Sequence, residues 1–215
     1  MKKQPAINDL LKVMAKLRSP KGCPWDREQT HMSLRRHAVE EVYELIDAIE
    51  ARDDHEMAEE LGDLLLQVVF HSQMAKERGA FDFETVVRRQ VDKLIRRHPH
   101  VFSTTKVKNV DEVWANWEKI KRAEKLGTKH ERKSALDGIP KHLPALLRAE
   151  KLVKKARKVF ADGHHFSKSK TRLSKSALAK QLFDLVEFAQ SKNWSAEELL
   201  CGEIKRREKQ LRRLE

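Results

Sequence analysis

Residues 39–63 read VEEVYELIDAIEARDDHEMAEELGD and hold two clusters of carboxylates separated by a short turn. If the first half is a helix, its acidic side chains fall within roughly 120° of one another and its apolar side chains occupy the opposite side. The acidic residues are Glu40, Glu41, Glu44 and Asp47. An amphipathic helix with a solvated acidic face is enough to explain this half by itself.

The second half, continued to residue 71, is apolar around most of a helical circumference. One polar stripe interrupts it within roughly 80°. Its members are Glu56, Glu60, Asp63, Gln67 and His71. A helix of this kind is typically buried, and buried carboxylates are costly unless they are paired or bind a cation. Two interpretations stay open: neutralising Lys and Arg side chains, or a divalent cation, for which oxygen ligands favour Mg²⁺ or Mn²⁺ over zinc.

The rest of the composition favours an all-α protein. The 215 residues include only 7 Gly and 6 Pro, so turn formers are scarce among many Leu, Glu, Lys and Arg. No apolar run is long enough for a membrane span, and the first residues lack the apolar segment of a signal peptide. Cys23 and Cys201 form no CxxC pair. We therefore expect a reduced, cytoplasmic protein.

The net charge of +12 lies mostly in residues 141–215, which hold 19 Lys and Arg against 9 Asp and Glu. A basic tail can contact nucleic acid, or it can be a solvated helical surface. No motif for reading nucleic acid accompanies the charge, so we expect nucleic acid not to be the partner.

Helical spacing of apolar residues predicts several further helices. They cover residues 7–17, 84–97, 143–160, 177–190 and 196–214. Between the first two, residues 19–26 contain two prolines and a glycine and are expected to form a loop. Thr30 or Ser33 is expected to cap the helix that carries Glu40, and Asp111 to cap a helix containing Trp114 and Trp117.

The polar segment 127–142 is expected to be a linker between a domain at residues 1–126 and a basic helical region at residues 143–215. Within that region, a turn is expected at Asp162–Gly163. Further along, residues 179–186 repeat the pattern of residues 58–65. The repeat keeps Asp184 in place of Asp63 but has Gln181 in place of Glu60. The second copy is therefore not expected to hold a metal.

Several motifs, in order and spacing, resemble those of the MazG family of nucleoside triphosphate pyrophosphohydrolases. They are GCPWD at residues 22–26, EExxE at 40–44, ExxD at 60–63, KxxRRHPHVF at 93–102, WxxxK at 117–121, and SALD with LPAL at 134–146. The resemblance covers residues 7–150 closely and the remainder weakly. It implies an all-α, MazG-like four-helix bundle, an obligate homodimer, and a smaller, degenerate second MazG-like region.

The resemblance also implies an activity: Mg²⁺-dependent hydrolysis of nucleoside triphosphates at the α–β bond, giving the monophosphate and pyrophosphate, with Mn²⁺ as a possible substitute. Glu41, Glu44, Glu60 and Asp63 correspond to the metal ligands. Glu40, or Glu41 itself, would activate the attacking water.

The phosphate-binding positions of the family fall on Lys93, Arg97 and Lys121, with Arg96 as an alternative to Arg97. Trp25 and Trp117 correspond to residues that line the nucleotide pocket, with Trp25 stacking on the base. Some active members carry a lysine four residues before the ExxD glutamate, whereas this chain has Glu56.

Three other classes of protein compete with this interpretation. One is a catalytically inactive relative that binds a nucleotide or a partner. Another is a di-metal carboxylate bundle, which needs paired Glu-x-x-His motifs; only Glu28 and His31 fit, without a second pair. The last is a nucleic-acid-binding protein that uses residues 141–215.

Overall fold

The computed structural model of the chain describes residues 5–129, 131–160 and 173–214, and within these ranges every regular element is a helix. The expected all-α class is confirmed. The chain divides into two compact units, Met1–Trp114 and Ala115–Glu215. The expected turn at Asp162–Gly163 and the amino-terminal residues Met1–Gln4 lie outside the described residues.

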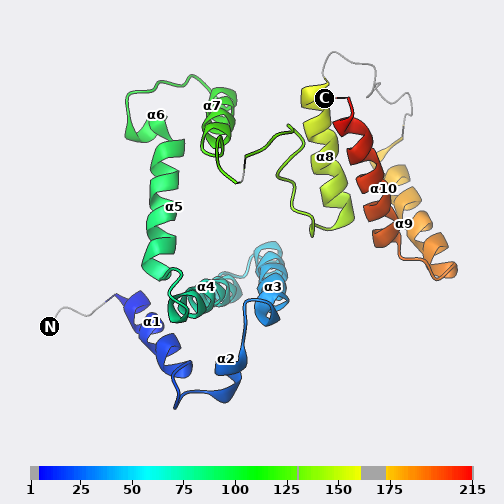
Figure 1. The fold of residues 1–215 in the computed structure, drawn as a ribbon. Helices are drawn as coiled ribbons and strands as arrows, with labels where there is room; N and C mark the ends of the chain where they lie inside the picture. Colours follow the sequence, from blue (N-terminus) through cyan, green and yellow to red (C-terminus); the bar gives the residue numbers. More distant parts are fainter. Residues whose placement is uncertain (1–4, 130, 161–172, 215) are drawn as a thin grey trace. The chain divides into compact units, whose positions relative to one another are not determined.

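The first unit is arranged around its longest helix, α4 (Figure 1). Its elements are α1 (Ala6–Leu17), α2 (Pro24–Glu28), η1 (Ser33–Arg35), α3 (His37–Ala51), α4 (Asp54–Glu77), α5 (Phe83–Arg97), α6 (Pro99–Phe102) and the start of α7 (Val110–Ala123). Helix α4 packs against α1, α3 and α5, with the closest pairing to α3. Because α3 and α4 carry the two acidic clusters, this pairing brings the clusters together.

The turn between α3 and α4 is specified by two adjacent residues. Arg52 adopts a left-handed conformation with φ 57°, which ends α3. The carboxylate of Asp53 then accepts hydrogen bonds from the backbone N–H groups of His55 and Glu56, at 2.9 and 3.1 Å. An aspartate in this position satisfies donors that the first turn of a helix leaves without partners. The two acidic helices are therefore joined by a short, well-capped turn.

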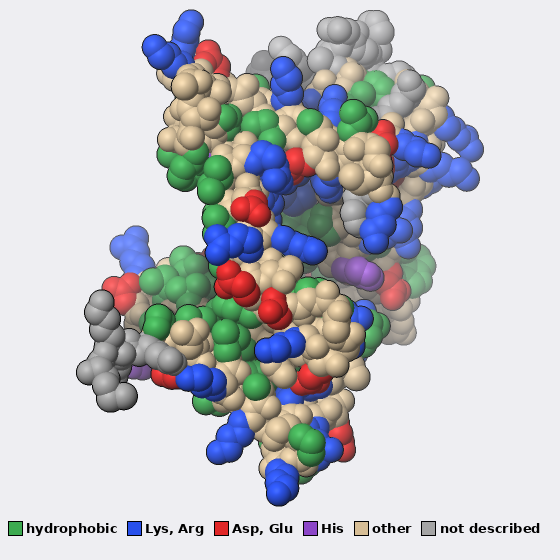
Figure 2. All heavy atoms as spheres, turned by 60° about the vertical axis from the view of Figure 1, so that its left-hand side comes forward, with side chains coloured by type: hydrophobic (Ala, Val, Ile, Leu, Met, Phe, Trp, Pro, Cys, Tyr) green, Lys and Arg blue, Asp and Glu red, His purple; other side chains and the backbone are tan. Residues whose placement is uncertain are grey.

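The core of the first unit is small and gathers at the C-terminal half of α4. Its buried members are Met14, Leu34, Val69, Phe70 and Met74. Many larger apolar side chains stay exposed, and hydrophobic atoms lie open among the charged ones on the face shown in Figure 2. The apolar surface that the sequence provides is therefore only partly covered within one copy of the chain.

Local expectations failed in three places. Residues 19–26 do not form a simple loop, because a helix begins at Pro24, where the fixed φ of proline suits the first helical position. Thr30 and Ser33 do not cap α3; each hydroxyl instead accepts the backbone N–H of the other residue, at 2.9 and 3.1 Å.

The cap of α7 was also assigned to the wrong residue. The helix begins at Val110, which places Asp111 in its first turn. Asn109 is the residue whose side chain accepts the backbone N–H of Glu112, at 2.9 Å, while Glu112 accepts the N–H of Lys108 at 2.8 Å. Asn109 therefore caps α7, two residues before the expected position, and Glu112 bonds the residue before the cap instead of closing a capping box with Asn109.

The second unit packs α8 (Ala145–Val159) against α10 (Ala196–Arg212), with α9 (Lys175–Ser191) contacting α10. Its buried core consists of Leu136, Ala145, Leu152, Ala156, Ile204 and Leu211. Leu136 comes from the segment before α8, which the carboxylate of Asp137 ties to Arg212 at 2.8 Å. Of the helices in the described ranges, none is both long and apolar enough to cross a membrane.

Candidate metal site

Three carboxylates from α3 and α4 converge in the first unit. Oxygen atoms of Glu41, Glu60 and Asp63 lie within 4.8 Å of one another. Glu41 and Glu60 face each other across the α3–α4 pair, and Asp63 follows Glu60 by slightly less than one turn. The structure thus brings the EExxE and ExxD motifs to one point, as their helical positions predict.

The electrostatics of this group show uncompensated like charge. Partial burial, together with the charges of Asp63 and Glu44, raises the pKa of Glu41 above its usual range. Burial raises the pKa of Glu60 as well, and Glu44, Asp63 and Glu41 add to the effect. Glu44 is itself exposed, yet it lies close enough to act on both groups. The causes of these two pKa shifts include no Lys or Arg side chain. The interpretation in which Lys and Arg neutralise the carboxylates therefore gains no support.

One oxygen of the group has no partner. Oε2 of Glu60 is buried and makes no hydrogen bond. A buried carboxylate oxygen is costly in this state, and a cation would satisfy it. The donors are all carboxylate oxygens, which suit Mg²⁺ or Mn²⁺. The residues present therefore fit a divalent cation.

Glu40 lies outside this group. It is exposed and pairs with Nδ1 of His37 at 3.2 Å. The ring of His37 meets the ring of Trp25 edge-on, with centroids 6.3 Å apart. Trp25 is 54% exposed, so it is not a core side chain and its ring is available for contact. These three residues form a connected series from α2 to the acidic helix α3.

Two predicted phosphate-binding residues lie on α5. Lys93 lines a shallow hollow on this helix with Phe81, Thr85, Val86, Arg89, Gln90, Asp92 and Arg96. Arg97 is the last residue of α5, where a cation also suits the helix dipole. Arg96 faces the hollow, so the alternative of Arg96 or Arg97 stays open.

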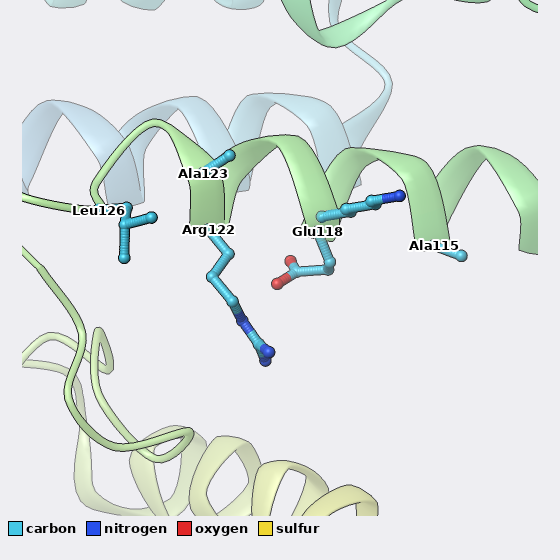
Figure 3. A pocket seen from close by; sticks show the side chains of 6 residues that line it. Ala115, Glu118, Arg122, Ala123 and Leu126 are labelled. Carbon is cyan, nitrogen blue, oxygen red and sulfur yellow. The ribbon is translucent and has the colours of Figure 1, made fainter.

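Trp117 and Lys121 lie in the second compact unit. The ammonium of Lys121 sits 4.5 Å from the ring centroid of Trp117 and 3.6 Å from Glu118. Figure 3 shows Glu118 and Arg122 pointing from the same side of α7, over a hollow lined also by Ala115, Lys119, Ala123 and Leu126. One face of α7 makes this hollow together with Leu126 just beyond the end of the helix, and we assign no ligand to it.

The structure adds contacts that the sequence did not predict. Nε2 of Gln67 donates to Oε1 of Glu41 at 3.4 Å. His31 does not join Glu28 in a metal motif; its Nδ1 lies 2.7 Å from Nδ1 of His71, and the rings stack. The sequence does place Gln67 and His71 on the polar stripe of α4. It could not identify their partners, Glu41 and His31, because these are distant in the sequence.

The sequence matches a protein-family model and several named relatives. Residues 29–102 match the family model described as the MazG nucleotide pyrophosphohydrolase domain. That range contains all four predicted metal ligands, Glu41, Glu44, Glu60 and Asp63, together with Lys93 and Arg97.

Two bacterial relatives carry the name nucleoside triphosphate pyrophosphohydrolase. The Escherichia coli protein is 48% identical over 157 residues, covering 73% of this chain and 59% of its own length. The Thermotoga maritima protein, whose name adds pyrophosphatase MazG, is 47% identical over 156 residues, covering 73% and 58%. The chain thus spans less than two thirds of the length of these relatives. A crystal structure of a MazG-related protein from Thermotoga maritima aligns with a TM-score of 0.45 at 25% identity, covering 53% of this chain and 97% of the other.

Proposed function

Because this chain belongs to the MazG family through the domain at residues 29–102, we propose that it hydrolyses nucleoside triphosphates at the α–β bond with the help of Mg²⁺. The products would be a nucleoside monophosphate and pyrophosphate. The observation that carries the proposal is the convergence of Glu41, Glu60 and Asp63 within 4.8 Å. Mutual repulsion of this kind is relieved where a divalent cation binds between the carboxylates.

The carboxylates would hold the cation, and Glu44 would complete the set. When bound, Mg²⁺ would neutralise phosphate charge and lower the pKa of a water molecule. The water oxygen attacks the α-phosphorus, a new P–O bond forms, and the bond to the bridging oxygen breaks so that pyrophosphate leaves. Glu40 is the adjacent carboxylate outside the cation group, so it can accept the proton of the water and share it with His37.

The triphosphate tail needs cations, and Lys93 and Arg97 of the first unit are assigned to it. Their charges would stabilise the leaving pyrophosphate. Trp25 would stack on the base, supported by its exposed ring and by the edge contact with His37. Trp117, whose ring holds the ammonium of Lys121, would orient that lysine.

The direct test is turnover of a panel of ribo- and deoxynucleoside triphosphates with and without Mg²⁺, with separate assays for pyrophosphate and orthophosphate. Cation-dependent pyrophosphate plus monophosphate is the expected result. Orthophosphate plus diphosphate would place the cut at another bond. The absence of turnover with every nucleotide would instead favour the catalytically inactive, binding-only relative.

We further infer that two copies of the chain associate through α3 and α4. Val39, Val42, Ile46 and Ile49 follow each other at heptad spacing on α3, and each is 41–55% exposed. On α4, the apolar residues Leu61, Leu65 and Val68 are also open. Sedimentation analysis should give a dimer, and Ile46→Lys should give a monomer. A wild-type monomer at high protein concentration would contradict this inference.

A cytoplasmic location is proposed from the two cysteines. Cys23 and Cys201 are free thiols, which persist in a reducing compartment. Labelling of both thiols in unreduced protein from intact cells would support this location.

A further inference from the structure

The polar stripe of α4 continues beyond the carboxylates. Gln67 follows Asp63 by four residues and His71 follows Gln67 by four, so all three lie on one face of the helix. Each step of this kind advances about one turn along the axis. Gln67 and His71 are half-buried, and the proposed chemistry does not use either of them.

Buried polar atoms without partners gather along this stripe. In the described part of the chain, four side-chain atoms are in this state: His31 Nε2, Glu60 Oε2, Gln67 Oε1 and Arg132 Nε. Three of them belong to the stripe or to its neighbour His31. A buried polar atom without a partner is costly to the fold. A cation explains the oxygen of Glu60, but it does not explain Gln67 and His31.

The chemistry of Gln67 fixes what its open atom can bind. Its amide nitrogen donates to Oε1 of Glu41 at 3.4 Å. The opposite orientation would turn the amide oxygen toward a carboxylate, which repels it. The remaining Oε1 is therefore an acceptor, buried beside the metal site, and it needs a hydrogen-bond donor.

The His31–His71 pair lies further along the same stripe. The rings are parallel within 5°, with centroids 5.0 Å apart, and one Nδ1 donates to the other across 2.7 Å. Burial, together with His31, lowers the pKa of His71, which keeps that imidazole neutral near pH 7. Since Nδ1 of His31 is used within the pair, its buried Nε2 is left for another group.

The polar stripe runs from the carboxylates toward the C-terminal half of α4, and the segment that carries Trp25 lies at that half. The segment after α1 is anchored at the C-terminal half of α4, because Arg18 binds Glu77 and also donates to the carbonyls of Asp26 and Gln29. A nucleotide whose phosphates lie at the carboxylates would then extend toward Gln67, His31 and the Trp25 segment.

We propose that Gln67 and His31 bind the nucleoside part of the substrate, with Oε1 of Gln67 accepting a hydrogen bond from a sugar hydroxyl or an exocyclic amine of the base. This inference rests on the proposed function of the carboxylate site. It makes Gln67 a specificity-determining residue, and its bond to Glu41 joins nucleoside recognition to the cation-binding group.

The test compares nucleotides that differ by one donor. ATP against dATP reports on the 2′-hydroxyl, dATP against its 2′,3′-dideoxy form on the 3′-hydroxyl, and GTP against ITP on the exocyclic amine. Gln67→Met keeps the side-chain shape and removes the acceptor. For each pair, we compare kcat/KM for the nucleotide with the donor to kcat/KM for the nucleotide without it. In Gln67→Met we expect this ratio to fall about tenfold for one pair, which is the size of a lost hydrogen bond to substrate. The affected pair identifies the source of the donor.

Gln73→Met is the matched control. Gln73 lies on the same helix and makes the corresponding contact to a glutamate, donating to Glu77 at 3.0 Å, but it lies away from the carboxylates. The control should leave all three ratios unchanged. If Gln67→Met lowers kcat equally for every nucleotide, Gln67 only positions Glu41 and the proposal is wrong.

Binding can be tested apart from hydrolysis with the non-hydrolysable α,β-methylene analogues of the same nucleotide pairs. Their affinities in the presence of Mg²⁺ are measured by calorimetry, so the nucleoside assignment can fail or stand independently of the proposed function. If wild type does not turn over nucleotides but binds the pairs differently, and Gln67→Met loses the difference, the nucleoside assignment stands and hydrolysis does not. Equal binding of all analogues to wild type and variant overturns the nucleoside assignment whether or not hydrolysis occurs.

His31→Phe is a second, independent variant, with His55→Phe as its control on an exposed position of α4. Phenylalanine keeps the stacking on His71 and removes both ring nitrogens. A rise in KM for nucleotides, with kcat retained, is the expected result. Unchanged KM with reduced thermal stability would assign His31 to packing alone and remove it from the proposal.

Discussion

Arg18 forms a bidentate ion pair with Glu77: its Nε lies 2.9 Å from Oε1 and its Nη2 lies 2.7 Å from Oε2. The same guanidinium rests 5.4 Å from the ring centroid of Phe70, and only 9% of the Arg18 side chain is exposed. The pair fastens the end of α1 to α4 across 59 residues of sequence. It therefore stabilises the packing that holds the segment after α1, which carries Trp25, at the C-terminal half of α4.

Glu77→Gln tests the contribution of this pair to stability. The hydrogen bonds from Arg18 hold the pKa of Glu77 below its ordinary value of 4.5. A carboxylate with a lowered pKa stabilises the fold above its unfolded pKa and loses that effect as pH falls through the folded one. We expect the variant to lose about 1 kcal/mol at pH 7, because the carboxylate is partly exposed.

The measurement is urea unfolding of both proteins from pH 7 to pH 3. The difference between them should shrink below pH 4.5. A difference that stays constant over this range would mean that the charge of Glu77 is not the cause. Gln73, which also donates to Glu77, should be left unchanged so that only the ion pair is altered.

Glu41→Gln should separate activity from stability. Removing one ligand of the cation should lower kcat by about 100-fold or more. Removing one of several repelling charges should leave the melting temperature of the cation-free protein equal or higher. Turnover equal to wild type would end the catalytic assignment. Glu50→Gln, an exposed position on the same helix, is the control.

Cation binding should stabilise the protein in proportion to its occupancy. A cation at 100 times its dissociation constant adds about 2.7 kcal/mol if it binds only the folded state. We expect Mg²⁺ or Mn²⁺ to raise the melting temperature of wild type, and Asp63→Asn to reduce that rise. A rise of the same size in the variant would show that the ion binds elsewhere.

The same stabilisation should depend on pH. The pKa values of Glu41 and Glu60 are raised by burial and neighbouring carboxylates, so protons compete with the cation above the ordinary range of a glutamate. The cation-induced shift in melting temperature should therefore decline as pH falls from 7 toward 5. In the cation-free protein the sign is opposite, because raised pKa values favour the folded state as these groups protonate. An apparent cation affinity that does not change with pH would contradict the raised values.

Asp137→Ala should destabilise the second unit. Its carboxylate accepts the backbone N–H of Ser134 at 3.1 Å and pairs with Arg212 at 2.8 Å, next to the buried Leu136. We expect a loss of about 1–2 kcal/mol in the unfolding transition of that unit. Asp184→Ala, which removes an exposed pair with Lys180, should cost far less. Equal effects would show that Asp137 does not anchor its segment.

The sequence was sufficient for the helices and carboxylates of the site because both follow from local periodicity. Glu41 and Asp63 could be placed on facing stripes without knowledge of the tertiary structure. The start of α2 at Pro24 and the cap at Asn109 were missed because several polar or turn-forming residues compete within a few positions. His31 and His71 could not be paired from sequence, since 40 residues separate them and only packing brings them together.

The short turn at Arg52 and Asp53 has a consequence for how the site forms. Gln67 and Glu41 are only 26 residues apart, so the carboxylate cluster depends on contacts that are local in the chain. Local contacts close small loops and form early during folding. The hairpin of α3 and α4 can therefore assemble its ligands before the remaining helices dock. Its own negative charge opposes that step, so a divalent cation would act as a folding partner of the hairpin.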